Sequence, residues 1–160
     1  MKEIVYLTGL PASGKTTYRI AEYPNHAVIS NDEVTEAYAA RHHLNYGEAW
    51  QRLSSNDVVR EGKKRFEKAV KEGRNIVIDN TNLTVESRAL YRAAGYVLKA
   101  VVFVISEDQR KQNARHRKAS GGKFIDESTV CEMRKKFVLP SKSEGFSEII
   151  YVRQDNAFDA

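Results

Sequence analysis

Residues 9–16 read G-L-P-A-S-G-K-T, a spacing of glycine, lysine and threonine that can hold a chain of phosphates. Gly9 and Gly14 let the backbone wrap closely, so that amide groups and the dipole of a following helix face the phosphates. Lys15 adds a charge that can reach the terminal phosphates, and Thr16 offers a hydroxyl ligand for Mg²⁺. We therefore expect a nucleotide site formed by Gly9, Pro11, Ala12, Ser13, Gly14, Lys15, Thr16 and Thr17.

Asp79 follows a second apolar segment, at residues 76–78, and is well placed to hold Mg²⁺ directly or through water. Proteins that hydrolyse nucleotides to drive motion usually carry a glutamate after this acid, which activates water. Here the next residue is Asn80, which cannot act as a base, so the sequence disfavours hydrolysis. It also lacks the N-K-x-D motif that selects guanine, which disfavours a switch protein. The alternative role for Asp79 is to cap a turn at the end of a strand.

Asp32 is the candidate general base for transfer of a phosphoryl group to a hydroxyl. It follows the apolar residues 27–29, and ligands of open parallel sheets bind where the strands end. A kinase needs a base near the acceptor hydroxyl, and a carboxylate can take that proton. An acid in the first turn of a helix also stabilises the helix dipole, so the sequence alone leaves both roles open.

Residues 109–118 read Q-R-K-Q-N-A-R-H-R-K, a basic segment that contains no acid. Like charges four residues apart, such as Lys111 and Arg115, destabilise an isolated helix, so we expect an anion to compensate them. The next residues, 120–122, read S-G-G and can serve as a hinge. These features predict a lid that closes arginines over the transferring phosphoryl group. The alternative is a solvated basic face.

Five short runs of aliphatic residues are expected to form the strands that position these groups. They are continuous rather than alternating, as in parallel strands covered on both faces, and lie at residues 4–7, 27–29, 76–78, 101–105 and 149–152. Residues 56–72 and 84–94 have helical spacing, each followed by a glycine that can cap the end. The alternation predicts an α/β fold, with about five parallel strands, helices on both faces and an arginine-bearing lid.

Length and composition indicate one soluble domain. The chain has 160 residues, of which 41% are hydrophobic and 29% charged, values typical of globular domains. We expect the domain to span residues 1–153, with residues 154–160 as a C-terminal tail. Apolar runs are far shorter than the roughly 20 residues that span a bilayer, and the start does not resemble a secretion signal. These observations predict a cytoplasmic protein with no membrane segment and no obligate protein partner.

The cysteine and histidine content predicts no metal site of its own. Cys131 is the single cysteine, so neither an internal disulfide nor a multi-cysteine zinc site can form. The four histidines lack the i, i+4 spacing that lets two of them share a metal on a helix. The net charge of +5 favours polyanionic partners such as nucleic acid, although proteins that bind none also carry such a charge. Trp50, the single tryptophan, is expected in the core because tryptophan has a high average burial, and the alternative is that it stacks on a base.

Five segments together resemble the kinase domain of polynucleotide 5'-hydroxyl kinases, both the phage enzymes and the kinase half of the animal kinase-phosphatases. They are G-L-P-A-S-G-K-T-T at residues 9–17, S-N-D-E at 30–33, I-D-N-T-N at 78–82, N-A-R-H-R at 113–117 and F-V-L-P-S-K-S-E-G-F at 137–146. The resemblance covers nearly the whole chain. The D-x-D-G-T phosphatase motif of the bifunctional relatives is absent, which implies a kinase domain alone.

The resemblance implies a role for each matched residue. Lys15 and Thr16 match the residues that bind the phosphates of ATP and Mg²⁺. Asp32 matches the general base that takes the proton from the acceptor hydroxyl. Arg117 matches the lid arginine that contacts the transferring phosphate, and Arg115 is expected to assist it.

Two positions depart from the phage pattern and keep the acceptor open. Thr35 stands where phage members carry an arginine that contacts the phosphate of the acceptor. The phage acid lies at the position of Asn80, whereas Asp79 is the acid here, and neighbouring strand residues point to opposite faces. We expect an ATP-dependent kinase acting on a nucleic-acid hydroxyl, most simply the 5'-OH of DNA or RNA. The alternatives are a hydroxymethylated base within DNA, a small metabolite, or a nucleotide-dependent nucleic-acid binding module without transfer activity.

Overall fold

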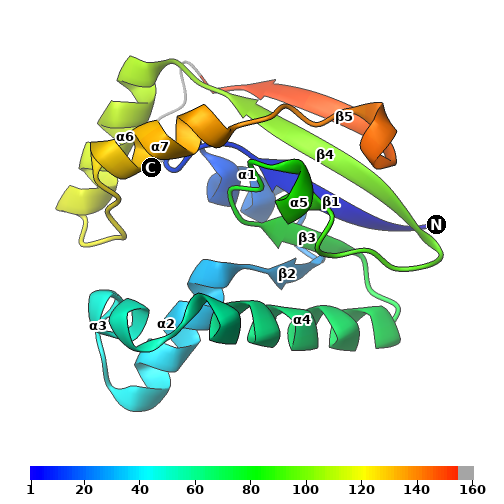
Figure 1. Ribbon diagram of the computed structural model, residues 1–160, viewed down its shortest axis with the longest axis horizontal. Helices are drawn as coiled ribbons and strands as arrows, with labels where there is room; N and C mark the ends of the chain where they lie inside the picture. The colour runs from blue at the N-terminus through cyan, green and yellow to red at the C-terminus, as the bar shows by residue number, and fades with distance from the viewer. Residues whose placement is uncertain (155–160) are drawn as a thin grey trace.

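The five expected strands form one parallel sheet (Figure 1). The computed structural model describes residues 1–154, so the expected tail at 154–160 lies, apart from Gln154, outside the described residues. The strands are β1 (Lys2–Thr8), β2 (Ala27–Ile29), β3 (Ile76–Asp79), β4 (Tyr96–Val104) and β5 (Phe146–Arg153). Their spatial order is β2-β3-β1-β4-β5, and every neighbouring pair is parallel. The expected α/β fold is therefore confirmed.

The register brings the carboxyl ends of three strands to one edge of the sheet. Leu7 of β1 lies beside Asp79 of β3, and Ile29 of β2 lies beside Ile78 of β3. The segments that leave β1, β2 and β3 therefore start close together at this edge, where ligands of open parallel sheets bind. These segments carry the phosphate-binding motif, Asp32 and Asp79.

Seven α-helices and one 3₁₀ turn connect the strands of residues 1–154. They are α1 (Lys15–Glu22), α2 (Asn31–His42), α3 (Tyr46–Arg52), α4 (Ser55–Lys71), α5 (Val85–Arg88), α6 (Glu107–Ala119), α7 (Glu127–Lys136) and η1 (Lys142–Glu144). Side chains that accept a hydrogen bond from the first turn cap α2 to α7, namely Ser30, Asn45, Ser54, Thr84, Ser106 and Asp126. Such caps satisfy amide groups that a helix leaves without acceptors.

The helix expected over residues 84–94 is wrong in length, because α5 ends at Arg88. The Arg88 guanidinium is fully buried and pairs with Glu144 at 2.9 Å. The chain then leaves the helix so that Tyr91 can enter the core, where its amide donates to the hydroxyl of Tyr6 (2.9 Å). Tertiary burial therefore outweighs the local helical spacing.

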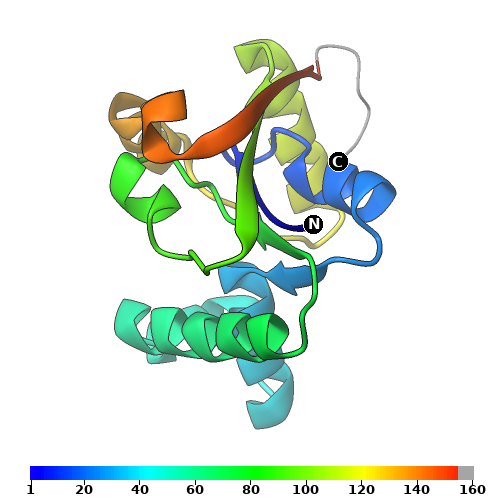
Figure 2. The ribbon, with the colours of Figure 1, turned by 90° about the vertical axis from the view of Figure 1, so that its right-hand side faces the viewer.

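Hydrophobic clusters cover both faces of the sheet, as continuous apolar strands require. One cluster packs Tyr6 of β1 with Phe66 of α4 and Tyr91. The other packs Phe103 of β4 with Tyr18 of α1, their ring centroids 5.2 Å apart. Figure 2 shows α1 on one side of the sheet and α5 on the other. Within residues 1–154, no helix has the length and apolar character needed to cross a membrane.

Candidate active site

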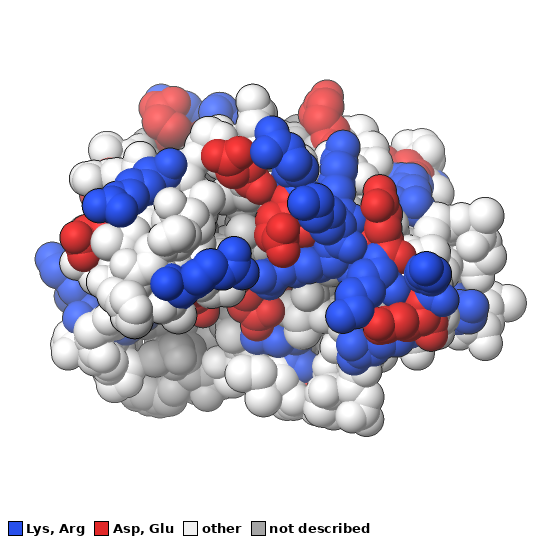
Figure 3. All heavy atoms as spheres, turned by 90° about the horizontal axis from the view of Figure 1, so that it is seen from below, with Lys and Arg blue, Asp and Glu red and all other residues white. Residues whose placement is uncertain are grey.

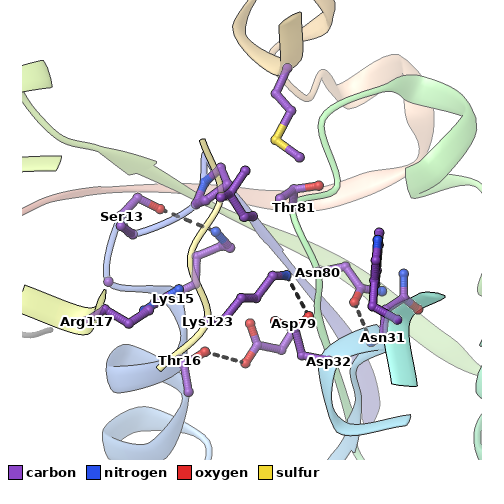
Figure 4. Close-up of a pocket in the computed structure, with 16 residues that line it drawn as sticks. Ser13, Lys15, Thr16, Asn31, Asp32, Asp79, Asn80, Thr81, Arg117 and Lys123 are labelled. Carbon is purple, nitrogen blue, oxygen red and sulfur yellow. Dashed lines mark hydrogen bonds and ion pairs between the residues drawn. The ribbon is translucent and has the colours of Figure 1, made fainter. Parts of the chain in front are cut away.

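A cleft of about 210 Å³ lies at the edge of the sheet where the three strands end (Figure 4). Its walls come from the loop after β1, helices α2 and α3, the loop after β3, and the segment from α6 to α7. The cleft gathers Lys15, Thr16, Asp32, Asp79 and Arg117, which the sequence had indicated from distant segments. Figure 4 shows the side chains of these residues around one space. The phosphate-binding loop and the carboxylates of Asp32 and Asp79 therefore line the same space.

The loop before α1 has the shape of an anion cradle. Gly14 has a φ of 90°, a left-handed conformation that residues with side chains rarely adopt. It begins α1 without a side-chain cap, unlike the residues that begin α2 to α7. The first helical hydrogen bond runs from Tyr18 N to Gly14 O (3.1 Å), so the amides of residues 15–17 have no acceptor within the helix. A phosphate group fits these free donors.

Lys15 is buried within this cradle. Its ammonium group donates to the backbone oxygens of Gly9 (3.0 Å) and Leu10 (2.8 Å). Burial lowers the pKa of Lys15 to about 8, although the nearby Asp79 carboxylate opposes the shift. A phosphate group would compensate this charge more fully than neutral carbonyl oxygens do.

Asp79, rather than Asn80, contacts the threonine of the cradle. The hydroxyl of Thr16 donates to Asp79 Oδ2 (3.1 Å), and the same oxygen forms an ion pair with Arg19 Nε (2.9 Å). The side-chain oxygen of Asn80 instead accepts a hydrogen bond from the backbone amide of Asn31 (2.8 Å). A hydroxyl and a carboxylate fit Mg²⁺, which takes one or two carboxylates with substrate phosphates and keeps several waters. Residues 1–154 contain no cluster of three His, Cys, Asp or Glu side chains that could hold a metal by themselves.

Asp32 lies in the first turn of α2 and lines the cleft, a position compatible with either role that the sequence left open. Its Oδ1 accepts hydrogen bonds from the hydroxyl of Tyr46 (2.8 Å) and from Lys123 Nζ (2.7 Å). Burial raises the pKa of Asp32, but the Lys123 charge and these two hydrogen bonds hold it below its ordinary value. The group is therefore a carboxylate at neutral pH, the form that can accept a proton.

Helix α6 brings Arg117 to the cleft and leaves Arg115 outside it. Arg117 is half-buried and lines the cleft, whereas Arg115 is exposed and does not. Asn113, on the same helix, donates to the backbone oxygen of Ala12 (3.1 Å) and so fastens α6 to the cradle. Of the two lid arginines that the sequence indicated, Arg117 has the geometry for contact with a phosphate.

Arg110 of the basic segment is compensated by acids of the chain itself. The Arg110 side chain is 1% exposed and pairs with Glu107 (2.8 Å) and with Glu127 of α7 (2.6 Å). Arg134 of α7 also pairs with Glu107 (2.6 Å). These acids lie outside residues 109–118, and they hold α6 and α7 together.

Glu144, in the last segment of the resemblance, supports the loop that carries Asp79. Its two carboxylate oxygens accept from the Arg88 guanidinium (2.9 and 3.1 Å), and Arg88 also donates to the backbone oxygen of Asn82 (2.9 Å). The side-chain amide of Asn82 donates to Leu7 O (2.7 Å) at the end of β1. This chain of contacts fixes the loop after β3.

The sequence did not identify three residues of the site, Tyr46, Trp50 and Lys123. Lys123 reaches Asp32 from 91 positions along the chain, and Tyr46 reaches it from 14. The expectation that Trp50 is buried is wrong, because the residue is 58% exposed and lines the cleft. A local signal was present, since the two aromatic residues lie four positions apart in a helix that begins with the capping residues Asn45 and Glu48.

Thr35, at the position where phage members carry an arginine, is fully buried. Its hydroxyl donates to the backbone oxygen of Asn31 (3.0 Å) within α2. It is therefore closed to an acceptor, and the cations that line the cleft together with Asp32 are Lys15, Lys123 and Arg117.

Comparison with known proteins agrees with this arrangement. A family model for an AAA domain, AAA_33, matches residues 4–140. Two curated relatives are each 26% identical: the bifunctional polynucleotide phosphatase/kinase of Schizosaccharomyces pombe (strain 972 / ATCC 24843), over 155 residues, and the human heterogeneous nuclear ribonucleoprotein U-like protein 2, over 159 residues. These alignments cover 92% and 93% of the chain but only 33% and 21% of the relatives. The chain thus spans a third or less of their length.

Two solved structures share the fold. A proposed kinase from Chloroflexus aurantiacus j-10-fl has a TM-score of 0.67 and 17% identity, covering 97% of this chain and 86% of its own. A sugar kinase from Janibacter sp. HTCC2649 has a TM-score of 0.63 and 16% identity, covering 96% and 86%. The fold is therefore that of P-loop kinases, and the S. pombe relative confirms the resemblance seen in the sequence. The chain belongs to the AAA_33 family of AAA domains and is a P-loop protein of the kinase type.

Proposed function

We propose that this chain is an ATP-dependent kinase that transfers the γ-phosphate to a hydroxyl of nucleic acid, most simply the 5'-OH of DNA or RNA. One observation carries the proposal: a single cleft holds an anion cradle, an ionised carboxylate, an acid beside the cradle threonine and a lid arginine. The S. pombe polynucleotide phosphatase/kinase supports the choice of acceptor, since it is similar over 92% of the chain.

Each part of the cleft has a role in this transfer. The amides of the cradle and Lys15 would bind the phosphates, while Thr16 and Asp79 would hold Mg²⁺. Asp32 accepts the proton of the acceptor hydroxyl. Arg117 neutralises charge on the transferring group from the lid side. When bound, ATP supplies the phosphoryl group and Mg²⁺ neutralises part of its charge.

The basic surface of the molecule adds little to the case for nucleic acid. Figure 3 shows the face below the sheet, where many Lys and Arg side chains gather with Asp and Glu side chains between them. On α4 of this face, Arg60 pairs with Asp57 (3.1 Å) and Arg65 pairs with Glu61 (3.4 Å). Paired surface charges are weak evidence for a polyanion site, so the proposal rests on the cleft.

The acceptor is tested by offering ATP labelled in the γ-phosphate with three classes of acceptor. These are oligonucleotides with a 5'-OH, duplex DNA that carries hydroxymethylated bases, and a panel of nucleosides and sugars. We expect label on the 5' end of the oligonucleotides. Label on the hydroxymethylated duplex alone would mean that the acceptor is a modified base and not the 5'-OH. Label on small molecules alone would contradict a nucleic-acid acceptor.

The role of Asp32 is tested against a matched first-turn acid outside the cleft. Replacing Asp32 with Ala removes the base, so we expect the transfer rate to fall about 10²- to 10⁴-fold while ATP still binds. Asp108→Ala removes an exposed acid from the first turn of α6 and should leave the rate unchanged. Equal rates in the two variants would show that Asp32 only stabilises a helix dipole. Lys15→Ala should abolish transfer to every acceptor. Retained activity in this variant would contradict the assignment of the nucleotide site.

A further inference from the structure

Trp50 is the single tryptophan of the chain, and it lies in the candidate active site as a residue that is 58% exposed. It lines the same cleft as Lys15 and Asp32. Isolated exposed apolar residues are common on protein surfaces, but this residue is part of a cleft wall beside the proposed general base. Its exposed aromatic surface is therefore available to a ligand of that cleft.

Two contacts fix the position of Trp50 relative to Asp32. Trp50 stacks with Tyr46 one turn earlier on α3, with ring centroids 6.3 Å apart and planes inclined by 15°. The hydroxyl of Tyr46 donates to Asp32 Oδ1 (2.8 Å). Ala49, between the two aromatic residues, is fully buried and anchors α3. The indole is thus connected to the carboxylate through one intervening ring.

The cleft that Trp50 lines has a mixed wall that suits a flat aromatic group. Ile125 and Met133 are among its apolar residues, and a methionine thioether packs well against aromatic rings. Asn31 and Thr81 add hydrogen-bonding groups to the same cleft. Proteins bind unpaired nucleobases by this combination of aromatic stacking and a few polar contacts.

We propose that Trp50 is the stacking platform for the nucleobase of the acceptor's terminal nucleoside, which it holds so that the hydroxyl meets Asp32. This inference rests on the proposed function, because it takes the acceptor to be a nucleic acid. The donor nucleotide is held by its phosphates at residues 14–16, whereas Trp50 is joined to Asp32 through Tyr46. Stacking on Trp50 therefore serves the acceptor.

Intrinsic fluorescence tests this assignment without catalysis, because Trp50 is the only tryptophan in the chain. The probes are a 5'-OH oligothymidylate, the same oligomer with an abasic 5'-terminal residue, and ATP alone. We expect the oligothymidylate to quench the fluorescence and the other two probes to leave it unchanged. Equal quenching by the abasic oligomer would overturn the proposal, and quenching by ATP alone would place Trp50 at the donor site.

Steady-state kinetics tests the same assignment with two variants. Trp50→Ala should raise the KM for the 5'-OH oligothymidylate about 5- to 150-fold, the range expected for one lost base stack, with the KM for ATP unchanged. Trp50→Phe keeps an aromatic face and should restore most of the affinity. The abasic oligomer should give the same KM with wild type and Trp50→Ala. An unchanged KM for the oligothymidylate in Trp50→Ala would overturn the proposal.

The wild-type protein separates failure of this inference from failure of the proposed function. If wild type phosphorylates oligonucleotides and Trp50→Ala keeps the same KM, the stacking inference is wrong and the proposed function stands. If wild type phosphorylates sugars and no oligonucleotide, the nucleic-acid acceptor is wrong and the stacking role falls with it. Matching urea unfolding midpoints for wild type and Trp50→Ala establish that a raised KM comes from the lost ring and not from a misfolded α3.

Discussion

The two walls of the cleft are held in different ways. The wall next to the sheet, residues 9–16 and 79–82, is fastened by backbone and buried groups: Gly9 N donates to Thr81 O (3.0 Å), and the side chain of Asn82 is buried. The lid wall, residues 117–125, is fastened to α2 by the ion pair of Lys123 with Asp32, whose side chains are 27% and 45% exposed. Buried contacts are costly to break, whereas exposed ion pairs exchange easily.

This difference suggests that the two walls have different functions. The sheet wall holds the phosphate cradle and Asp79 in a fixed place, so it should determine stability and nucleotide binding. Lys123 of the lid wall donates to Asp32 Oδ1, the same carboxylate oxygen that accepts from Tyr46 of α3. Changes in the lid wall should therefore alter the rate and leave the fold intact.

Within the lid wall, the largest effect is expected at Arg117. Replacing Arg117 with Ala removes the cation that lines the cleft from α6, and we expect the transfer rate to fall about 10³- to 10⁵-fold, the range measured for arginine fingers. The urea unfolding midpoint should stay that of wild type, because the side chain makes no buried ion pair in the described chain. Single-turnover rates and unfolding curves measure the two quantities.

Arg115→Ala is the matched control for Arg117→Ala. Arg115 lies on the same helix with the same charge, but it is exposed and does not line the cleft. Its replacement should change the rate little. An equal loss of rate in both variants would mean that α6 acts through its overall charge and not through one positioned arginine.

The next largest effect is expected at Glu144, whose contacts with Arg88 support the sheet wall, and it is an effect on stability. Glu144→Gln leaves the Arg88 charge buried without a carboxylate, so we expect about 3–5 kcal/mol loss in the free energy of unfolding, measured by urea denaturation. The pKa of Glu144 is lowered: burial raises it, but the Arg88 guanidinium and the Ser141 amide outweigh burial. A carboxyl with a lowered pKa stabilises the fold above its unfolded-state pKa. The stability difference between wild type and variant should therefore shrink as the pH falls through the folded-state pKa.

Glu132→Gln is the control for Glu144→Gln. Glu132 pairs with Lys135 at 3.0 Å, but both side chains are about two-thirds exposed, at 65% and 67%. Exposed pairs contribute roughly 0–1 kcal/mol, so the unfolding midpoint should hardly move. A similar small change in both variants would contradict the view that the buried pair supports the sheet wall.

The same contrast explains which parts of the molecule the sequence predicted. The cradle and Asp79 follow apolar strands directly, so their positions are set by local chain geometry, and the strands themselves were predicted because their apolar runs are continuous. The neighbours of Asp32 could not be predicted in this way, since Lys123 approaches from 91 positions away. The predictions of a longer α5 and of a buried Trp50 were wrong for a similar reason, because tertiary packing decides which side chains are buried.

The smallest effect is expected at Lys123, and it is a shift in pH dependence. Lys123→Met removes the charge that lowers the pKa of Asp32, while burial continues to raise it, so the pKa of Asp32 should move upward. The carboxylate is the form that accepts a proton, so the acidic limb of the rate profile should move to higher pH. Lys118→Met is the control, because Lys118 lies over the Phe124 ring and not at Asp32. An acidic limb that stays in place in Lys123→Met would mean that Asp32 does not act as the base, since its closest cation would then have no bearing on proton transfer.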